Sequence, residues 1–177
     1  MAAPVLNPQE TLITTYLEMS SPREFEPSFV PRGDVRIEKM ESADVDFYLF
    51  LYRSVGEQWN WRDRLVVPRE QIKEILAGTQ THVHVLYVDG APAGYVELMH
   101  HGADVEIAYF GLREPFFGRG LGKHLLSYGI NEAWKLDANR VWVHTCNLDG
   151  PHALNNYQKR GFKIFKQEAE PMPEIYQ

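Results

Sequence analysis

Apolar and polar residues alternate along several short stretches of this 177-residue chain, and elsewhere apolar residues recur every three or four positions. Alternation, or enrichment in β-branched and aromatic side chains, is typical of β-strands, because successive side chains of a strand point to opposite faces. On these grounds strands are predicted over residues 12–19, 35–40, 82–88, 93–99, 104–112, 141–146 and 162–166.

Two helices are predicted between the second and third strands. The first follows Ser42, which is placed to cap it, and carries apolar residues at helical spacing from Val45 to Tyr52. The second begins near Pro68, whose fixed φ suits a first helical turn, and stops at Gly78.

Two more helices follow the central strands. A stripe of apolar side chains predicts a helix of about four turns; it consists of Leu121, Leu125, Leu126, Ile130, Ala133 and Trp134. Asp149 can cap the last helix, which has Pro151 in its first turn, and Gly161 stands where a left-handed residue commonly ends a helix.

This order of elements predicts a mixed α/β fold. The three central strands should form an antiparallel meander, because Asp89-Gly90 is a strong two-residue hairpin signal and His101-Gly102 separates the next pair. We expect one domain over residues 35–177, preceded by an N-terminal extension, residues 1–34, that carries one extra strand.

The charge of the chain argues against some classes of partner. Its net charge is −6, so it has no general electrostatic attraction for nucleic acid or an anionic membrane. No apolar run approaches the roughly eighteen residues that indicate a membrane span. The single cysteine, Cys146, cannot form an intramolecular disulfide, and the N-terminus lacks the pattern of a signal peptide. We expect a cytoplasmic protein, monomeric or homodimeric, that binds neither nucleic acid nor membrane.

Three alternating glycines, Gly118, Gly120 and Gly122, precede the third helix. Glycines let a backbone approach a ligand closely, and amides at a helix start favour a phosphate. The loop is not a nucleotide motif of the Walker or Rossmann type, because His124 stands where a Walker loop needs Ser or Thr and Lys123 stands at the last Rossmann glycine. A tight strand-to-helix connection without a ligand is the alternative.

Together with its neighbours, this loop resembles the GNAT superfamily of acyl-CoA-dependent N-acyltransferases. The signature of that superfamily is Gln or Arg, two residues, Gly, one residue, then Gly or Ala. Gly120 and Gly122 fill the two glycine positions, and Phe117 at the first position is a departure. A second block, Tyr followed shortly by Gly-Phe, matches Tyr157 and Gly161-Phe162.

The resemblance covers residues 35–166 in the order of elements. It implies the GNAT fold, a mixed, mostly antiparallel sheet flanked by helices, here with an extra N-terminal strand, and it implies acetyl-CoA as the acyl donor. By family analogy, two β-strand residues hold the pantetheine arm through their main chain and the glycine loop wraps the pyrophosphate. The residues so implied are Phe110, Leu112, Phe117, Gly118, Arg119, Gly120, Leu121, Gly122 and Lys123, with Asn147 near the place of a family asparagine.

Amide formation requires two further groups. An alkylammonium ion is not nucleophilic, so a base must remove a proton, and an acid often serves the departing thiolate. Glu106 lies fourteen residues before Gly120, the spacing at which histone-acetylating members carry their catalytic Glu, and is our first candidate base. Tyr157 occupies the family position whose hydroxyl serves the thiolate. The alternative for Glu106 is a solvent-facing or ion-paired strand carboxylate, and the alternative for Tyr157 is a ring that packs in the core.

The helical region between residues 45 and 62 lines the acceptor side in this superfamily. Tyr52, Trp59 and Trp61 are therefore candidates for substrate binding, and Glu97 is a second candidate carboxylate. Packing of the aromatic rings on the sheet, and a structural role for Glu97, are the alternatives.

The predicted function is transfer of an acetyl group from acetyl-CoA to a primary amine of a small molecule, peptide or protein, by direct attack in a ternary complex. Cys146, two residues after His144, suggests a covalent intermediate, but the resemblance implies direct transfer and a lone cysteine is usually a small hydrophobe. The histidines show no zinc-motif spacing, so no metal is predicted. A CoA-binding regulatory or interaction domain without catalysis is the alternative function.

Overall fold

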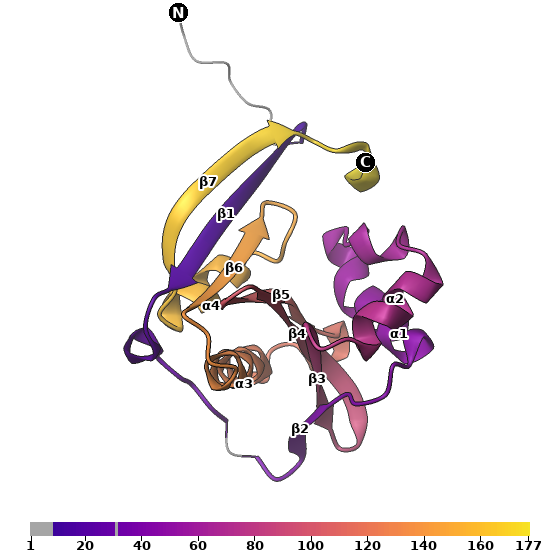
Figure 1. The fold of residues 1–177 in the computed structure, drawn as a ribbon, viewed down its shortest axis with the longest axis vertical. Coiled ribbons are helices and arrows are strands. Elements are labelled where there is room, and N and C mark those ends of the chain that lie inside the picture. Colours follow the sequence, from indigo (N-terminus) through magenta and orange to yellow (C-terminus); the bar gives the residue numbers. More distant parts are fainter. Residues whose placement is uncertain (1–8, 31) are drawn as a thin grey trace, which may run out of the picture.

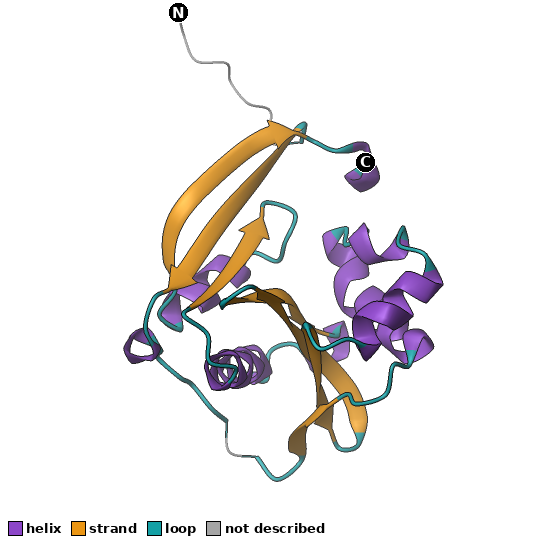
Figure 2. Ribbon diagram, in the orientation of Figure 1, coloured by secondary structure: helices purple, strands orange, loops and turns teal. Residues whose placement is uncertain are grey.

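The computed structural model describes residues 9–30 and 32–177, which form a seven-stranded sheet with helices on both faces (Figures 1 and 2). The strands are β1 (Thr11–Met19), β2 (Val35–Lys39), β3 (Thr81–Val88), β4 (Ala91–His101), β5 (Asp104–Leu112), β6 (Arg140–Cys146) and β7 (Lys163–Pro171). The helices are α1 (Val45–Gly56), α2 (Arg69–Ala77), α3 (Leu121–Lys135) and α4 (Ala153–Lys159). Short 3-10 turns are η1 (Pro22–Glu24), η2 (Glu57–Trp59), η3 (Asp63–Leu65), η4 (Glu114–Phe116) and η5 (Glu174–Tyr176).

The strand order is β2-β3-β4-β5-β6-β1-β7, and every neighbouring pair except β5–β6 is antiparallel. The predicted mixed, mostly antiparallel sheet is therefore confirmed, as is the meander of β3, β4 and β5. Asp89 and Gly90 both have positive φ, 48° and 81°, as a two-residue hairpin turn of type I′ requires.

The N-terminal strand lies inside the sheet. β1 pairs with β6 on one side and with β7 on the other, so that Tyr16 is opposite both His144 and Lys166. The sequence predicted this strand but did not indicate its neighbours. The boundary at residue 34 between the extension and the domain stays a prediction. β1, which precedes this boundary, lies in the sheet between β6 and β7, which both follow it in the sequence.

Helices cover the two faces of the sheet with separate apolar cores (Figure 1). α3 packs on β4 and β5 through the predicted stripe, of which Leu121, Leu125 and Ile130 are fully buried. On the other face α1 and α2 bury Leu51 and Ile72. None of the helices within the described residues is long and apolar enough to cross a membrane.

Two predicted helix caps are wrong. α1 begins at Val45, and its cap is Asp44, whose carboxylate accepts the backbone N–H of Phe47 at 3.0 Å, rather than Ser42. α4 begins only at Ala153 and has no side-chain cap. Asp149 instead binds its own loop, because its Oδ2 accepts a hydrogen bond from the Thr145 hydroxyl at 2.6 Å.

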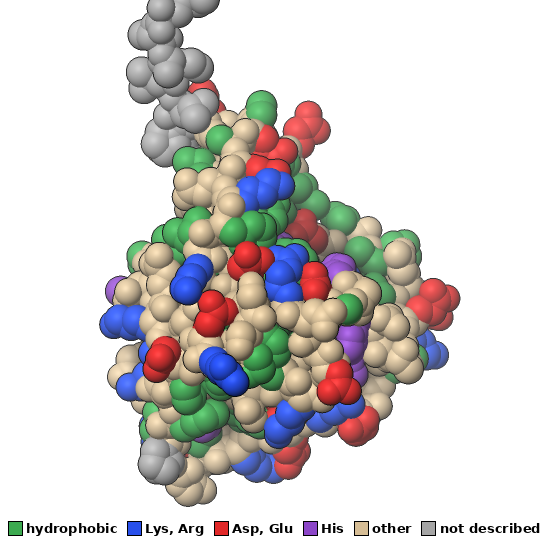
Figure 3. All heavy atoms as spheres, turned by 60° about the vertical axis from the view of Figure 1, so that its left-hand side comes forward, with side chains coloured by type: hydrophobic (Ala, Val, Ile, Leu, Met, Phe, Trp, Pro, Cys, Tyr) green, Lys and Arg blue, Asp and Glu red, His purple; other side chains and the backbone are tan. Residues whose placement is uncertain are grey.

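The face turned forward in Figure 3 carries acidic and basic side chains interspersed with apolar ones. Ion pairs also join three neighbouring inner strands of the sheet: Arg140 on β6 contacts Glu18 on β1 at 2.8 Å and Asp104 on β5 at 3.1 Å. Neighbouring charges therefore largely offset one another there, and exposed pairs of this kind contribute little to stability.

Gly161, just after α4, lies against the backbone of the segment that follows β1. Its φ is +106°, and a Cβ there would overlap the backbone carbonyl of Glu24. Gly90 also has a positive φ, +81°, but open space around it. We expect Gly90→Ala to lower the free energy of unfolding by about 1–2 kcal/mol through backbone strain alone. Gly161→Ala should cost roughly 1–3 kcal/mol more, because the segment at Glu24 must move. Urea unfolding of both variants measures the difference, and equal losses would contradict the packing described.

Candidate active site

β5 and β6 lie side by side for only four residue pairs, from Asp104–Arg140 to Ile107–Val143. Ala108 is an extra residue in β5, because Ile107 pairs with Leu98 of β4 while Tyr109 pairs with Glu97. Such a β-bulge bends its strand. The bend begins where β5 leaves β6, so the two strands diverge from this point.

A cavity of about 890 Å³ opens between the diverging strands. This volume lies within the range of roughly 300–1,000 Å³ that is common for small-molecule sites. Its walls come from β5, the end of β6, the glycine loop, α4 and the loop between η2 and η3; they include Ile107, Tyr109, Phe110, Leu112, Gly120, Gly122, His144, Cys146, Asn156 and Tyr157.

The glycine loop forms one end of the cavity. Gly118 and Gly120 both have positive φ, 76° and 74°, so the chain turns twice before α3 begins. Gly120 is the N-cap residue and, because it has no side chain, it cannot cap the amides of the first turn. The first amides of a helix then remain available, and together with the helix dipole they favour an anion.

Most of the residues implied for CoA binding lie at this cavity. Its lining includes Phe110, Leu112, Phe117, Gly118, Gly120, Leu121, Gly122 and Lys123. Arg119 does not line it; this side chain donates a hydrogen bond to the carbonyl of Pro115 and lies over the ring of Phe116.

The structure also does not bring Asn147 to the cavity. Its side-chain oxygen accepts the backbone N–H of Ile13, and its Nδ2 donates to the carbonyl of Thr11 at 3.0 Å. Asn147 therefore holds β1 beside the end of β6. The sequence could not show these contacts, because they join residues 134 and 136 positions apart.

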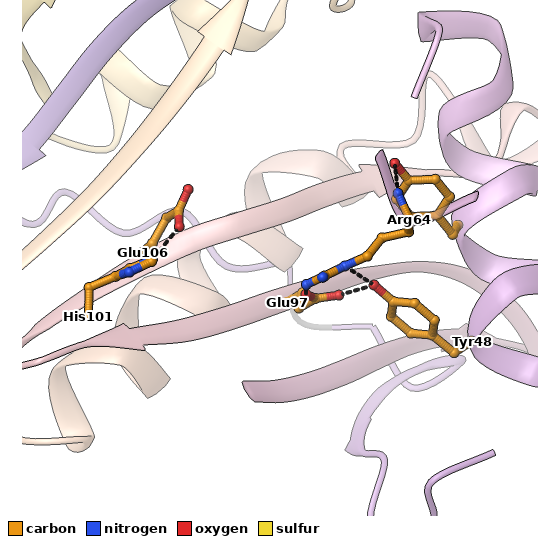
Figure 4. A network of polar contacts seen from close by, with 6 residues as sticks. Tyr48, Arg64, Glu97, His101 and Glu106 are labelled. Atoms are coloured by element: carbon orange, nitrogen blue, oxygen red, sulfur yellow. Dashed lines mark hydrogen bonds and ion pairs between the residues drawn. The ribbon is translucent and has the colours of Figure 1, made fainter. Parts of the chain in front are cut away.

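Glu106 on β5 lies between two histidines. Its Oε2 is 2.6 Å from Nε2 of His101, as Figure 4 shows, and its Oε1 is 3.2 Å from Nδ1 of His144. Burial of the carboxyl would raise its pKa, but the interactions with His144 and His101 outweigh burial and hold the pKa of Glu106 below its usual value. The carboxylate is thus ionised and its two oxygens are engaged.

His144 is the titratable side chain that connects Glu106 to the cavity. Its hydrogen bond to Glu106 raises the pKa of the imidazole above the usual value, and the charges of Asp149 and Asp63 act in the same direction against burial. When Nδ1 donates to Glu106, Nε2 is left as the nitrogen that accepts a proton. The side chain is 44% exposed and lines both the large cavity and a smaller one beside it.

Tyr157 on α4 is 6% exposed and lines the large cavity. Its ring packs edge-on against Phe110 and Phe162, so the predicted packing role is present. Burial raises the pKa of its hydroxyl well above the usual value, which keeps the proton in place. The structure records no hydrogen bond for this hydroxyl among the described residues, so it is available as a donor.

Glu97 does not line the cavity; it is completely buried and lies beside Tyr48 and Arg64 (Figure 4). Its two oxygens accept hydrogen bonds from the Tyr48 hydroxyl at 2.6 Å and from Nη2 of Arg64 at 2.8 Å. Burial raises the pKa of Glu97, and the nearby guanidinium opposes that shift. With both oxygens engaged, Glu97 is suited to holding η3 on the sheet rather than to binding a substrate.

Aromatic rings form another part of the cavity wall. Trp59 and Trp61 line the cavity, whereas Tyr52 is fully buried and packs against Trp61. Next to this wall a smaller cavity of about 190 Å³ is lined by Asp63, Arg64, Met99, Glu106, Ala108, Tyr109 and His144. His144, Tyr109, Ala108 and Asp63 belong to both cavities, so the two adjoin at the bulge.

Comparison with known families shows to which family the chain belongs. The model of the acetyltransferase (GNAT) family matches residues 45–162, about two thirds of the chain. The chain belongs to this family. An uncharacterised N-acetyltransferase of Bacillus subtilis (strain 168), YvbK, is 37% identical over 70 residues, which are 40% of this chain and 44% of that protein. The match thus spans less than half of this relative.

Solved structures share the GNAT fold. A GCN5-related N-acetyltransferase from Kribbella flavida superposes with a TM-score of 0.64 at 15% identity, over 90% of this chain and 58% of that one. An aminoglycoside acetyltransferase, meta-AAC0020, from an uncultured soil metagenomic sample, solved in complex with sisomicin, gives 0.59 at 15% identity, over 72% of this chain and 87% of that one. The GNAT fold that the sequence predicted is confirmed.

Cys146 also lines the cavity of this GNAT protein. Burial raises the pKa of its thiol. A nucleophilic cysteine needs a lowered pKa or a base bonded to its thiol, and the structure records no hydrogen bond between this thiol and His144 among the described residues. Among residues 9–30 and 32–177 no group of three or more His, Cys, Asp or Glu side chains is arranged to hold a metal ion.

The pairing of His144 with Glu106 yields a direct test. We expect Glu106→Gln to lower the pKa of His144, because the carboxylate is what outweighs burial of the imidazole. NMR titration of the His144 ring measures this shift, and His101→Gln, which leaves the carboxylate in place, is the control. The stabilisation from the raised His144 pKa is complete below the unfolded value near 6.5 and is lost as pH rises through the folded pKa. An unchanged pKa in Glu106→Gln would refute the pairing.

Proposed function

We propose that this protein is an N-acetyltransferase that transfers the acetyl group of acetyl-CoA to a primary amine in a ternary complex. The observation that carries the proposal is one cavity lined both by a phosphate-suited glycine loop and by His144 and Tyr157, with Glu106 paired to His144. A connection without a ligand would not need uncapped helix amides to face a cavity of this size.

The residues of the cavity fit acetyl-CoA. The loop from Phe117 to Lys123 suits the pyrophosphate, because its backbone turns twice and α3 has no side-chain cap. Beyond Ile107, β5 has no strand partner on the side of β6, so its main chain suits the amides of the pantetheine arm. Acetyl-CoA supplies the acyl carbon as a thioester.

We assign the base to His144 rather than to Glu106. Glu106 has a lowered pKa and both oxygens engaged, which makes it a poor proton acceptor. His144 can take the proton of the acceptor ammonium ion at Nε2, while Glu106 stabilises the resulting imidazolium and fixes the ring through Nδ1. Glu106 is then a positioning residue. Tyr157, whose hydroxyl stays protonated, donates to the sulfur that leaves the acyl carbon.

The charges around His144 favour a cationic acceptor. Asp63 and Asp149 line the cavity, and the structure records no ion pair for either one among the described residues. Trp59 and Trp61 add aromatic faces that attract a cation. The structural neighbour bound to sisomicin supports aminoglycosides as members of the acceptor panel, beside polyamines, amino acids and peptides.

Turnover of two variants tests the catalytic assignment. His144→Gln should lower kcat by about 10²–10⁴-fold, the usual contribution of a general base, and Tyr157→Phe should also slow turnover. His100→Gln is the control, because His100 lies on β4 outside the cavity lining. Thiol release from acetyl-CoA measures the rates. Full activity of His144→Gln would refute the base, and CoA binding without turnover of any amine would favour a non-catalytic CoA-binding domain.

The pH dependence separates the roles of His144 and Glu106. Because the base must be neutral, kcat/KM should rise with pH through the pKa of His144, which lies above 6.5. In Glu106→Gln this rise should move to lower pH, since the imidazole loses the partner that raises its pKa. A profile that keeps its midpoint in Glu106→Gln, or that falls with increasing pH over this range, would contradict the assignment.

Asp63 tests the preference for cationic acceptors. Asp63 accepts a hydrogen bond from the Tyr176 hydroxyl at 2.8 Å. Asp63→Asn removes the charge but keeps an oxygen that can accept this hydrogen bond. KM for a diamine should rise roughly 3–10-fold and less so at high salt, as expected for a partly exposed charge pair, while kcat, measured at a pH above the pKa of His144, changes little. A monoamine of equal length is the control substrate. Equal KM changes for both substrates would argue against charge recognition.

A further inference from the structure

Arg160 is a buried cation at the cavity, and its guanidinium has no partner among the residues that the structure describes. It follows α4, is only 8% exposed and belongs to the cavity lining. Within residues 9–30 and 32–177 the structure records no ion pair for it, and its Nε and Nη1 atoms are buried without a hydrogen bond. Burial lowers the pKa of the guanidinium, and no neighbouring carboxylate offsets this effect.

An arrangement of this kind needs an explanation. Guanidinium groups remain protonated in proteins, so Arg160 brings a full charge into a poorly solvated position. A desolvated and unpaired charge destabilises a folded protein unless another group compensates it. Nε and Nη1 are closed to solvent, so a ligand in the cavity would reach the guanidinium at Nη2, and the unpaired charge favours a ligand that is negatively charged.

The position of Arg160 places it near the glycine loop. It is one helical turn beyond Asn156, whose Nδ2 lies 3.9 Å from where a Cβ of Gly122 would be. Lys123 and Lys159 line the same cavity. The carboxylates of the lining, Asp63 and Asp149, come instead from η3 and from the loop after β6.

The segment after β1 holds this end of the cavity in place. The backbone N–H of Glu26 donates to the carbonyl of Arg160 at 2.9 Å, which fixes the end of α4. Two residues on, the N–H of Ser28 donates to Oγ of Ser127 on α3 at 2.8 Å, and Ser28 is part of the lining. The segment thus ties α4 to α3 beside the guanidinium.

We propose that Arg160 is a phosphate-binding residue of this cavity and makes charge-assisted hydrogen bonds to a phosphate group of CoA. The proposal rests on the proposed function, because CoA is the phosphate-bearing ligand that the function requires. Guanidinium groups suit phosphate because their planar donors match its oxygens. The pyrophosphate and the 3′-phosphate of CoA offer the same chemistry, and a comparison of CoA with 3′-dephospho-CoA distinguishes them.

Calorimetric titration tests the proposal. The ligands are CoA, 3′-dephospho-CoA and 4′-phosphopantetheine, and the proteins are wild type, Arg160→Gln, Arg160→Lys and Arg36→Gln. Arg36, exposed on the edge strand β2, is the matched control. Arg160→Gln should weaken CoA binding by roughly ten- to a hundredfold, the range for hydrogen bonds to charged groups, and Arg160→Lys should weaken it less.

The pattern across the ligands identifies the phosphate. A loss seen with CoA but not with 3′-dephospho-CoA assigns Arg160 to the 3′-phosphate, and equal losses with both assign it to the pyrophosphate. Wild-type affinity for CoA in Arg160→Gln would overturn the proposal. Unliganded Arg160→Gln should unfold at the same or a higher temperature than the wild type, because an unpaired buried charge is removed; a purely structural role predicts a lower temperature.

A separate measurement distinguishes failure of this proposal from failure of the proposed function. Inorganic pyrophosphate should raise the unfolding temperature of the wild type more than that of Arg160→Gln. If the wild type responds to pyrophosphate but does not bind CoA, the phosphate contact stands and the acetyltransferase proposal falls. If the wild type responds to neither ligand, both fall. If Arg160→Gln binds CoA and responds to pyrophosphate like the wild type, only the role of Arg160 falls.

Discussion

The short parallel contact between β5 and β6 is the constraint on which the rest of the structure depends. Four residue pairs hold the strands together, and the bulge at Ala108 then bends β5 away. The pairing places Glu106 and His144 close enough to interact, since each lies at or next to the last paired residues. The divergence opens the cavity between the same strands. One local irregularity thus creates the binding space and positions the polar groups at its inner end.

Charge is distributed unevenly along that cavity. Three basic residues line it: Lys123 on α3, Lys159 on α4 and Arg160 directly after α4. Two acidic residues, Asp63 on η3 and Asp149 in the loop after β6, line it beside His144. A ligand that is anionic at one end, together with a second ligand that is cationic, matches this separation. The net charge of −6 does not reveal it, because a sum over the chain contains no information about which side chains share a cavity.

Much of the fold followed from the sequence because local patterns determine it. All seven predicted strands and all four predicted helices are present, although β7 runs to Pro171 instead of ending at Lys166, and the glycine loop and Tyr157 lie at one cavity. Contacts between distant segments were not predictable in this way. His144 was considered only as a neighbour of Cys146, because its pairing with Glu106 joins residues 38 positions apart through the β5–β6 register. Asp44 replaced Ser42 as a cap because several residues near a helix start can serve, and only backbone geometry selects one.

The N-terminal segment connects these observations. β1 fills the sheet between β6 and β7, and Asn147 fastens its start to the end of β6, one residue after Cys146. The chain then passes the end of α4, where Glu24 leaves no room for a side chain at Gly161, and continues to α3. The same segment therefore supports the strand that carries His144 and the helix end that carries Arg160. Without it, β6 would lose its antiparallel neighbour and the end of α4 would lose its attachment to α3. The N-terminal residues thus belong to the framework of the candidate site.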